Sequence, residues 1–228
     1  MDIGELRRQI DSGKLKLSGS YSCIESGKLI NNVGEAFEYE INHGWDILSA
    51  NSCDRQWGSF NIRLLEYIEK QKYSEEELNA VLSGIQMEHL HWDWFKKSAC
   101  YTADGYEWFY MFADGKPQGA CLIYHPKDSV IESGNIFYIE FIEVAPWNRD
   151  NPIAKREFKG VGTLIIKCVL NFAVTKLKLK PGFSLHSLPQ AKGYYEKIGM
   201  KNYPERDKDT LVYFEMPRTN SAKMLGAA

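Results

Sequence analysis

A pair of glycines beside three cationic residues is the clearest chemical signal in the sequence. Lys155, Arg156 and Lys159 precede or adjoin the run Gly160-Val161-Gly162-Thr163. Glycine lets the backbone turn tightly, and the apolar run Leu164–Val174 predicts a helix whose first N–H groups have no partner inside it. A helix start of this kind with cations beside it suits a pyrophosphate. The stretch predicts a site for a phosphate-bearing cofactor, although the same glycines are also typical of an ordinary tight turn.

The glycines match neither of two common phosphate-binding patterns. A dinucleotide fingerprint needs one more glycine before Gly160, and a P-loop needs Gly-Lys followed by Ser or Thr. The surrounding elements must therefore decide between the two interpretations.

The elements predicted around the glycines are a hairpin and a strand before them, and a helix and a second strand after them. Ile136–Val144 is a β-branched and aromatic run that Pro146 stops, which is typical of a strand. Asp114-Gly115 lies between the apolar runs 107–112 and 119–124 and predicts a hairpin. The helix after the glycines leads to a short strand at Phe183–Ser187, most simply as a right-handed parallel β-α-β unit. Strand ends beside such a crossover helix splay and admit a ligand.

This order resembles that of the GNAT superfamily of acyltransferases. Val144-Ala-Pro146 is similar to the Val-x-Pro that ends the family's central strand, and Gly160-Val-Gly162 to its pyrophosphate loop. Ala191, Tyr195 and Gly199 are similar to its Ala-x-x-x-Tyr-x-x-x-Gly pattern. The chain departs from the family at Glu157, where Arg or Gln is usual, and in a longer loop between Pro146 and Gly160. The resemblance covers roughly residues 100–216.

The resemblance implies an α/β (α+β) fold with a mixed, mostly antiparallel central sheet, flanking helices and a splayed parallel strand pair at the cofactor site. It also implies acetyl-CoA as acyl donor. The backbone at Val144 would bind the thioester carbonyl oxygen, and Ser187 would contact the pantetheine arm. The residues expected to bind the phosphates are Arg156, Lys159, Gly160, Val161, Gly162 and Thr163.

Two carboxylates of the central strand are candidates for the general base. Strand alternation puts Glu140 and Glu143 on opposite faces, so at most one of them is expected to face the acceptor. Glu140 shares the face of Val144 and the strand position that often carries a base in the family, and it ranks first. Glu143 lies nearer the expected thioester and stays a candidate, and a paired structural carboxylate is the alternative for each.

A tyrosine is the candidate general acid. The resemblance assigns that role to Tyr195, whose neighbour Tyr194 points about 100° away if both lie on a helix. The two therefore cannot share the role, and a core tyrosine is the alternative for each.

A second polar cluster spans Glu88 to Asp93. Glu88 and His91 are three residues apart, and His89 and Asp93 are four apart, so each pair can share a helix face. A metal site needs more converging ligands than this. The sequence instead favours packing tryptophans with hydrogen-bonded polar groups or a pocket lining, and we expect no metal.

Composition narrows the function classes. A formal net charge of −2 gives no electrostatic reason to expect nucleic acid or an anionic membrane as partner. No apolar run has the length to span a bilayer, and no signal-peptide pattern is present. The five cysteines are odd in number and without a CxxC pair, which favours reduced thiols in the cytoplasm.

The expected organisation is an N-terminal extension of residues 1–60, a GNAT-like acyltransferase domain of residues 61–217 and a loose tail of residues 218–228. The leading functional hypothesis is an N-acetyltransferase acting on a primary amine of a small molecule or a protein. The alternatives are a catalytically silent acyl-CoA-binding module and a partner-binding protein on the same scaffold. The acceptor amine and the oligomeric state stay open.

Overall fold

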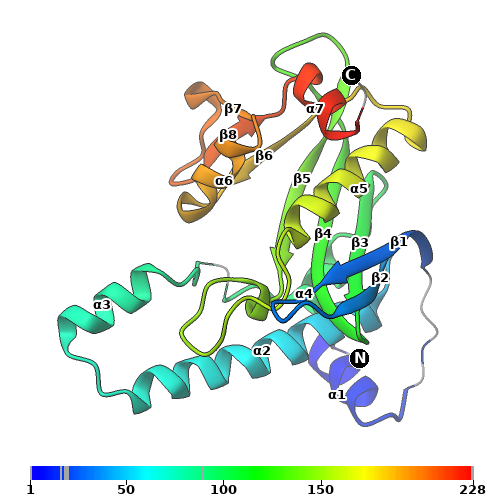
Figure 1. Cartoon of the computed structure of the whole chain (residues 1–228). Coiled ribbons are helices and arrows are strands. Elements are labelled where there is room, and N and C mark those ends of the chain that lie inside the picture. Colours follow the sequence, from blue (N-terminus) through cyan, green and yellow to red (C-terminus); the bar gives the residue numbers. More distant parts are fainter. Residues whose placement is uncertain (1, 16, 18–20, 89, 227–228) are drawn as a thin grey trace. The chain divides into compact units, whose positions relative to one another are not determined.

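The computed structural model describes residues 2–15, 17, 21–88 and 90–226 (Figure 1). The helices are α1 (Ile3–Asp11), α2 (Ile47–Lys70), α3 (Glu75–Ser83), α4 (Trp94–Cys100), α5 (Val161–Thr175), α6 (Lys192–Lys197) and α7 (Arg218–Met224). The strands are β1 (Ser22–Ile30), β2 (Ala36–His43), β3 (Tyr106–Ala113), β4 (Lys116–Asp128), β5 (Asn135–Val144), β6 (Phe183–Ser187), β7 (Lys201–Asn202) and β8 (Val212–Glu215).

The strands form one sheet in the order β1-β2-β3-β4-β5-β6-β8-β7. The β1–β2, β2–β3, β6–β8 and β7–β8 pairs are antiparallel, whereas β5 and β6 run parallel. A parallel pair needs a crossover connection, and α5 supplies it between β5 and β6. The predicted fold class, a mixed and mostly antiparallel sheet with flanking helices and one parallel pair, is confirmed.

The described residues divide into two compact units, and β3, β4 and β5 each contribute to both. The first unit comprises the described residues of Met1–Ala103, Trp108–Ala120 and Val144–Val161. The second comprises Asp104–Glu107, Cys121–Glu143 and the described residues of Gly162–Ala228.

Helix α2 is the longest helix of the first unit. Asp46 caps its start, because the carboxylate accepts the N–H groups of Leu48 and Ser49. Its buried residues recur at helical spacing, among them Trp57, Phe60, Leu64 and Ile68. The indole N–H of Trp57 donates to the carbonyl oxygen of Pro117, which fixes this helix against the start of β4.

The predicted hairpin turn lies between β3 and β4. Asp114 and Gly115 have φ angles of 52° and 65°. Two consecutive residues with positive φ are what a two-residue type I′ turn requires, and Asp-Gly adopts that turn at low cost.

The core of the second unit lies around β5, α5 and β6. Phe137 and Phe183 pair in register on the two parallel strands, and their rings stack at 5.4 Å. Helix α5 buries Ile165, Ile166 and Val169 together with other apolar residues, as its apolar sequence predicts.

Two helices bear on the expected organisation, which stays a prediction. Helix α2 runs through residues 60 and 61, where the sequence places the start of the acyltransferase domain, because its buried stripe continues without a break. The expected loose tail of residues 218–228 contains helix α7. This helix is held in place because the Asn220 side chain donates to the carbonyl oxygen of Gly199 and Ser221 is fully buried.

A capping box is present at the start of α3. Ser74 and Glu77 exchange side-chain and backbone hydrogen bonds, and α3 begins directly after Ser74. Among the described residues, none of the helices combines the length and the apolar character that crossing a bilayer requires.

Candidate functional site

The glycine turn leads directly into α5. Gly160 has a φ of 79°, a left-handed conformation that favours glycine, and the helix begins at the next residue. Val161 is buried, whereas Gly162 and Thr163 are half-buried. The hydroxyl of Thr163 lies 2.9 Å from the hydroxyl of Tyr194 on α6. The start of α5 and one of the paired tyrosines are therefore in contact.

The cations before the glycines differ in what they contact. The Arg156 guanidinium binds the Asp150 carboxylate, with Nε 2.6 Å from Oδ1, and this pairing raises the pKa of Arg156. Lys159 is exposed. The loop is held by backbone contacts as well, since the Phe158 N–H donates to the Asn148 side chain at 2.9 Å. The sequence could not predict that Arg156 has a carboxylate partner within its own loop.

Strands β5 and β6 pair over only part of their length. Their parallel register joins Phe137 to Phe183, Tyr138 to Ser184 and Ile139 to Leu185. Strand β5 continues to Val144 and β6 to Ser187. The strands of this parallel pair therefore separate beyond Ile139, at the ends that lead toward α5 and α6, which is where ligands enter between parallel strands.

The two candidate bases lie on opposite faces of β5, as alternation predicts. Glu140 is half-buried, and burial raises the pKa of its carboxyl group while Lys208 opposes the shift. Glu143 is 7% exposed. Val144 is the last residue of β5 and is half-buried.

A tyrosine–histidine pair lies on the face of Glu140. The Tyr138 hydroxyl is 2.6 Å from His186 Nδ1, and His186 Nε2 is 2.9 Å from the carbonyl oxygen of Arg206. A carbonyl oxygen only accepts, so Nε2 carries the hydrogen and Nδ1 accepts from Tyr138. Burial lowers the pKa of His186, which favours this neutral form.

Sequence reasoning missed this pair. Alternation along β5 could have placed Tyr138 on the face of Glu140. It could not have placed His186 there, because neither strand alone determines the register between β5 and β6.

Tyr195 lies on the other face of the sheet. Its ring is 6.0 Å from that of Phe214, and Phe214 pairs with Leu185, which is in register with Ile139. Tyr195 therefore shares the face of Ile139 and, by alternation, of Glu143. Burial raises the pKa of the Tyr195 phenol, so the phenol keeps its proton at neutral pH.

Ser187 ends β6 and is buried. Its hydroxyl donates to the carbonyl oxygen of Leu188 at 2.8 Å. The predicted contact of Ser187 with a pantetheine arm stays a prediction.

The polar cluster before α4 caps that helix. The Asp93 carboxylate accepts the N–H of Lys96 at 2.7 Å and pairs with Arg7, and Trp94 is almost fully buried. His89 of the predicted cluster lies outside the described residues. Among the residues that the structure describes, no group of three or more His, Cys, Asp or Glu side chains could hold a metal ion.

No known family model matches this sequence, and no curated protein matches it significantly. Many solved structures are similar to this chain. The three described next are 12–14% identical to it in sequence.

The structure of apo FdhC, described as a nucleotide-linked sugar GNAT, is 14% identical, with 86% of this chain and 93% of that chain covered and a TM-score of 0.47. A putative GNAT-family acetyltransferase from Desulfovibrio desulfuricans is 12% identical, with 79% and 99% covered and a TM-score of 0.47. The PaiA N-acetyltransferase of Thermoplasma acidophilum, solved in complex with coenzyme A, is 12% identical, with 77% and 98% covered and a TM-score of 0.42.

These values describe similarity only, so a function for this chain has to come from its own residues. The mixed strand order, the parallel pair and the glycine turn that opens α5 together agree with the GNAT-like architecture that the sequence resemblance implies.

Proposed function

We propose that this protein is an N-acyltransferase that moves an acetyl group from acetyl-CoA to a primary amine of a small molecule or a protein. The observation that carries the proposal is the separation of β5 from β6 beyond Ile139, next to a crossover helix that begins directly after Gly160. A separated parallel pair with a free helix start is an arrangement that can admit an extended, phosphate-bearing molecule.

The residues at the start of α5 fit the diphosphate of coenzyme A. The first N–H groups of the helix, from Val161 to Thr163, have no acceptor inside the helix and carry its positive dipole end. Gly160 adds no side chain that would obstruct the approach, and no atom of a residue distant in the sequence lies within 4 Å of the position its Cβ would take. Lys159 is exposed beside them. Because Arg156 is bound to Asp150, we assign it a supporting role in the loop, with phosphate contact only if that pair opens.

Acetyl-CoA supplies an activated acyl group when it is bound. The chain must orient the thioester, remove a proton from the amine and return a proton to the departing sulfur. We assign carbonyl binding to the backbone at Val144 and positioning of the pantetheine arm to Ser187.

Glu140 is the base in this proposal, and Glu143 is the alternative. Glu140 is half-buried, and its raised pKa brings it nearer the range in which a carboxylate accepts a proton effectively. Glu143 is more deeply buried but lies on the face of Tyr195.

Tyr195 is the acid. A phenol with a raised pKa is protonated at neutral pH and can donate to a thiolate. We assign the acid role to Tyr195 alone, because the Tyr194 hydroxyl contacts the Thr163 hydroxyl at the start of α5.

Release of free coenzyme A from acetyl-CoA, measured by chromatography with panels of amines, tests the proposal. Amine-dependent release supports it. Binding of acetyl-CoA by calorimetry without release would select a silent acyl-CoA-binding module, and no binding at all would select a partner-binding protein. We propose a cytoplasmic location from the reduced state expected of the five cysteines.

Calorimetry with Gly160→Trp tests the cofactor placement. We expect affinity for coenzyme A to fall at least tenfold, because the indole obstructs the helix start. Gly13→Trp is the matched control, since Gly13 also has a positive φ, 69°, and open space around its Cβ position. Wild-type affinity in the Gly160 variant would contradict the placement.

A further inference from the structure

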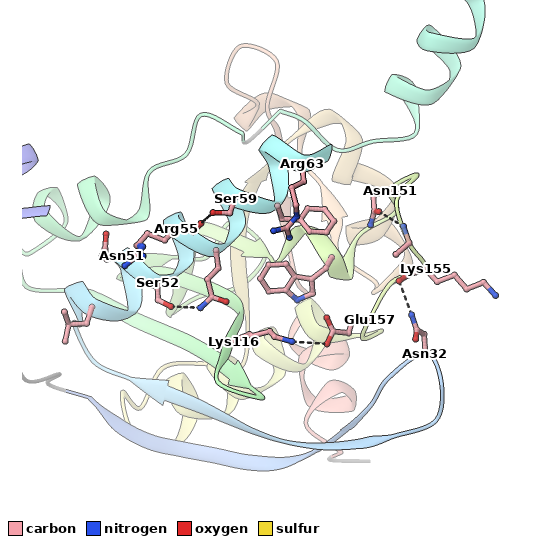
Figure 2. Close-up of a pocket in the computed structure, with 15 residues that line it drawn as sticks. Asn32, Asn51, Ser52, Arg55, Ser59, Arg63, Lys116, Asn151, Lys155 and Glu157 are labelled. Atoms are coloured by element: carbon pink, nitrogen blue, oxygen red, sulfur yellow. Dashed lines mark hydrogen bonds and ion pairs between the residues drawn. The ribbon is translucent and has the colours of Figure 1, made fainter. Parts of the chain in front are cut away.

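The first unit contains a large cavity, and the acyl-transfer proposal assigns a role to none of its lining residues. Its volume is about 860 Å³, within the range of small-molecule sites. One side is formed by α2, and the other by the loop after β5 and the turns at Asn32 and Lys116. Figure 2 shows Arg55, Ser59 and Arg63 following one another along α2, with Asn151 and Lys155 on the loop.

The charge of the lining is opposite to that of the whole chain. Four cationic side chains line the cavity, and Glu157 is the single carboxylate among its described lining residues. Glu157 faces Lys116, with the charged atoms 4.0 Å apart. Arg55 has a partner at 3.4 Å in Asp11, outside the lining. Among the residues that the structure describes, no carboxylate pairs with Arg63, so an anion entering the cavity meets a guanidinium that is not neutralised.

Two aromatic rings supply an apolar wall. The rings of Phe60 and Trp147 meet edge to face at 6.0 Å. The Trp147 indole N–H donates to Gln118 at 2.9 Å, which fixes its orientation. The Arg63 guanidinium lies 5.6 Å above the Phe60 ring, so the unpaired charge and the aromatic wall are adjacent.

Amide and hydroxyl groups complete the lining, and the rim is already fixed. Gln56 donates to Ser52 at 3.1 Å on α2. Across the cavity, the Asn32 side chain donates to the carbonyl oxygen of Lys155 at 3.1 Å and ties the loop to the turn between β1 and β2. Figure 2 shows this contact and the amine of Lys155 directed outward at the rim. A preformed rim reduces the ordering cost of binding.

We infer that this cavity binds a nucleoside phosphate, with the phosphate at Arg63, the planar base against Phe60 and Trp147, and the sugar hydroxyls near the amides and serines. A bare phosphate would leave the aromatic wall unused, and an uncharged aromatic ligand would leave Arg63 without a counterion. None of the residues to which the acyl-transfer proposal assigns a role lines this cavity. Because coenzyme A also contains a nucleoside diphosphate, the experiment must separate a free nucleotide from the nucleotide half of that cofactor.

Calorimetric titration of the full chain with UDP, ADP and ribose 5-phosphate at low salt is the test. We expect at least one of the two nucleotides to bind with a stoichiometry near one, and ribose 5-phosphate to bind at least tenfold more weakly because it lacks both the base and the second phosphate. Arg63→Gln is expected to weaken nucleotide binding at least tenfold, whereas Lys70→Gln, on the same helix outside the cavity, is expected to leave it unchanged. Circular dichroism of both variants checks that α2 is intact.

A second titration repeats the nucleotide arm in saturating coenzyme A. Persistent nucleotide binding supports a separate site in the first unit. Displacement by coenzyme A, absence of nucleotide binding, or full affinity in Arg63→Gln would each overturn the inference. Failure of coenzyme A to bind while UDP or ADP still binds would reject the acyltransferase proposal and leave the cavity assignment standing.

Discussion

At the scale of single residues, the proposed acid and the proposed base lie on opposite faces of the sheet. Tyr195 packs on Phe214, whereas Glu140 shares its face with Tyr138 and His186. The proposal places a molecule between the separated ends of β5 and β6 with the acid on one face and the base on the other, so the two roles do not require the two side chains to touch.

Tyr195→Phe tests the acid. We expect kcat to fall about 10²-fold, in the range of general acid catalysis, with little change in affinity for coenzyme A. The phenyl ring keeps the packing against Phe214, so only the proton donor is removed. Tyr21→Phe, at an exposed position, is the matched control. An unchanged kcat in steady-state assays removes Tyr195 from the acid role.

Glu140→Gln tests the base through the pH profile. Burial raises the pKa of Glu140, so the carboxylate gains its proton at a higher pH than a solvated glutamate would. The wild type is therefore expected to lose kcat/KM as the pH falls through this raised pKa. Glu140→Gln should lower kcat/KM about 10²-fold or more and abolish this acidic limb. If Glu143→Gln instead removes the limb, the role belongs to Glu143.

At the scale of elements, Asp54 links α2 to the start of α4. Its carboxylate accepts the N–H groups of Trp94 and Phe95 at 2.8 and 2.9 Å, and it pairs with Arg7 of α1. These N–H groups open a helix and have no partner within it. One side chain thus satisfies a helix start that is distant in the sequence.

Asp54→Ala is expected to lower the free energy of unfolding by about 2–3 kcal/mol, because it leaves two helix N–H groups unpaired. Urea denaturation followed by circular dichroism measures the change. Glu66→Gln, at an exposed position of the same helix, serves as the control. A loss below about 0.5 kcal/mol would show that water replaces the carboxylate at no cost.

The elements predicted from sequence were those with local signals. A run of β-branched and aromatic residues, Pro146 and the glycine turn delimit β5 and α5, and Asp114-Gly115 fixes a hairpin through its backbone preferences. The contact between Tyr138 and His186 depends on strand register, and the pairing of Arg156 with Asp150 depends on the path of a loop. Both are decided by tertiary packing, which the residues of one segment do not encode.

At the scale of the whole molecule, the burial of the cysteine side chains distinguishes the parts that solvent reaches from those that it does not. Cys23 and Cys100 are exposed, whereas Cys53, Cys121 and Cys168 are buried, and none of the five forms a disulfide. Burial raises the pKa of the Cys121 thiol and so suppresses its reactive thiolate.

Titration with a thiol reagent should therefore label two cysteines quickly in the native protein and five after denaturation. Peptide mass mapping identifies the sites. Rapid native labelling of Cys121 would mean that the core of the second unit opens on the time scale of the reaction.

The domain boundary expected at residues 60–61 is a prediction that belongs to this scale. Residues 60 and 61 lie inside α2, which is 24 residues long. Division into units follows contacts between distant segments, and β3, β4 and β5 each contribute to both units.

The central claim is that the N–H groups opening α5 hold the diphosphate of coenzyme A. Residue-resolved ¹H–¹⁵N NMR during titration with coenzyme A tests it most directly. We expect the amide signals of Val161, Gly162 and Thr163 to shift the most, because each N–H gains an anionic acceptor. Saturable binding of coenzyme A that leaves these three signals unmoved would contradict the claim.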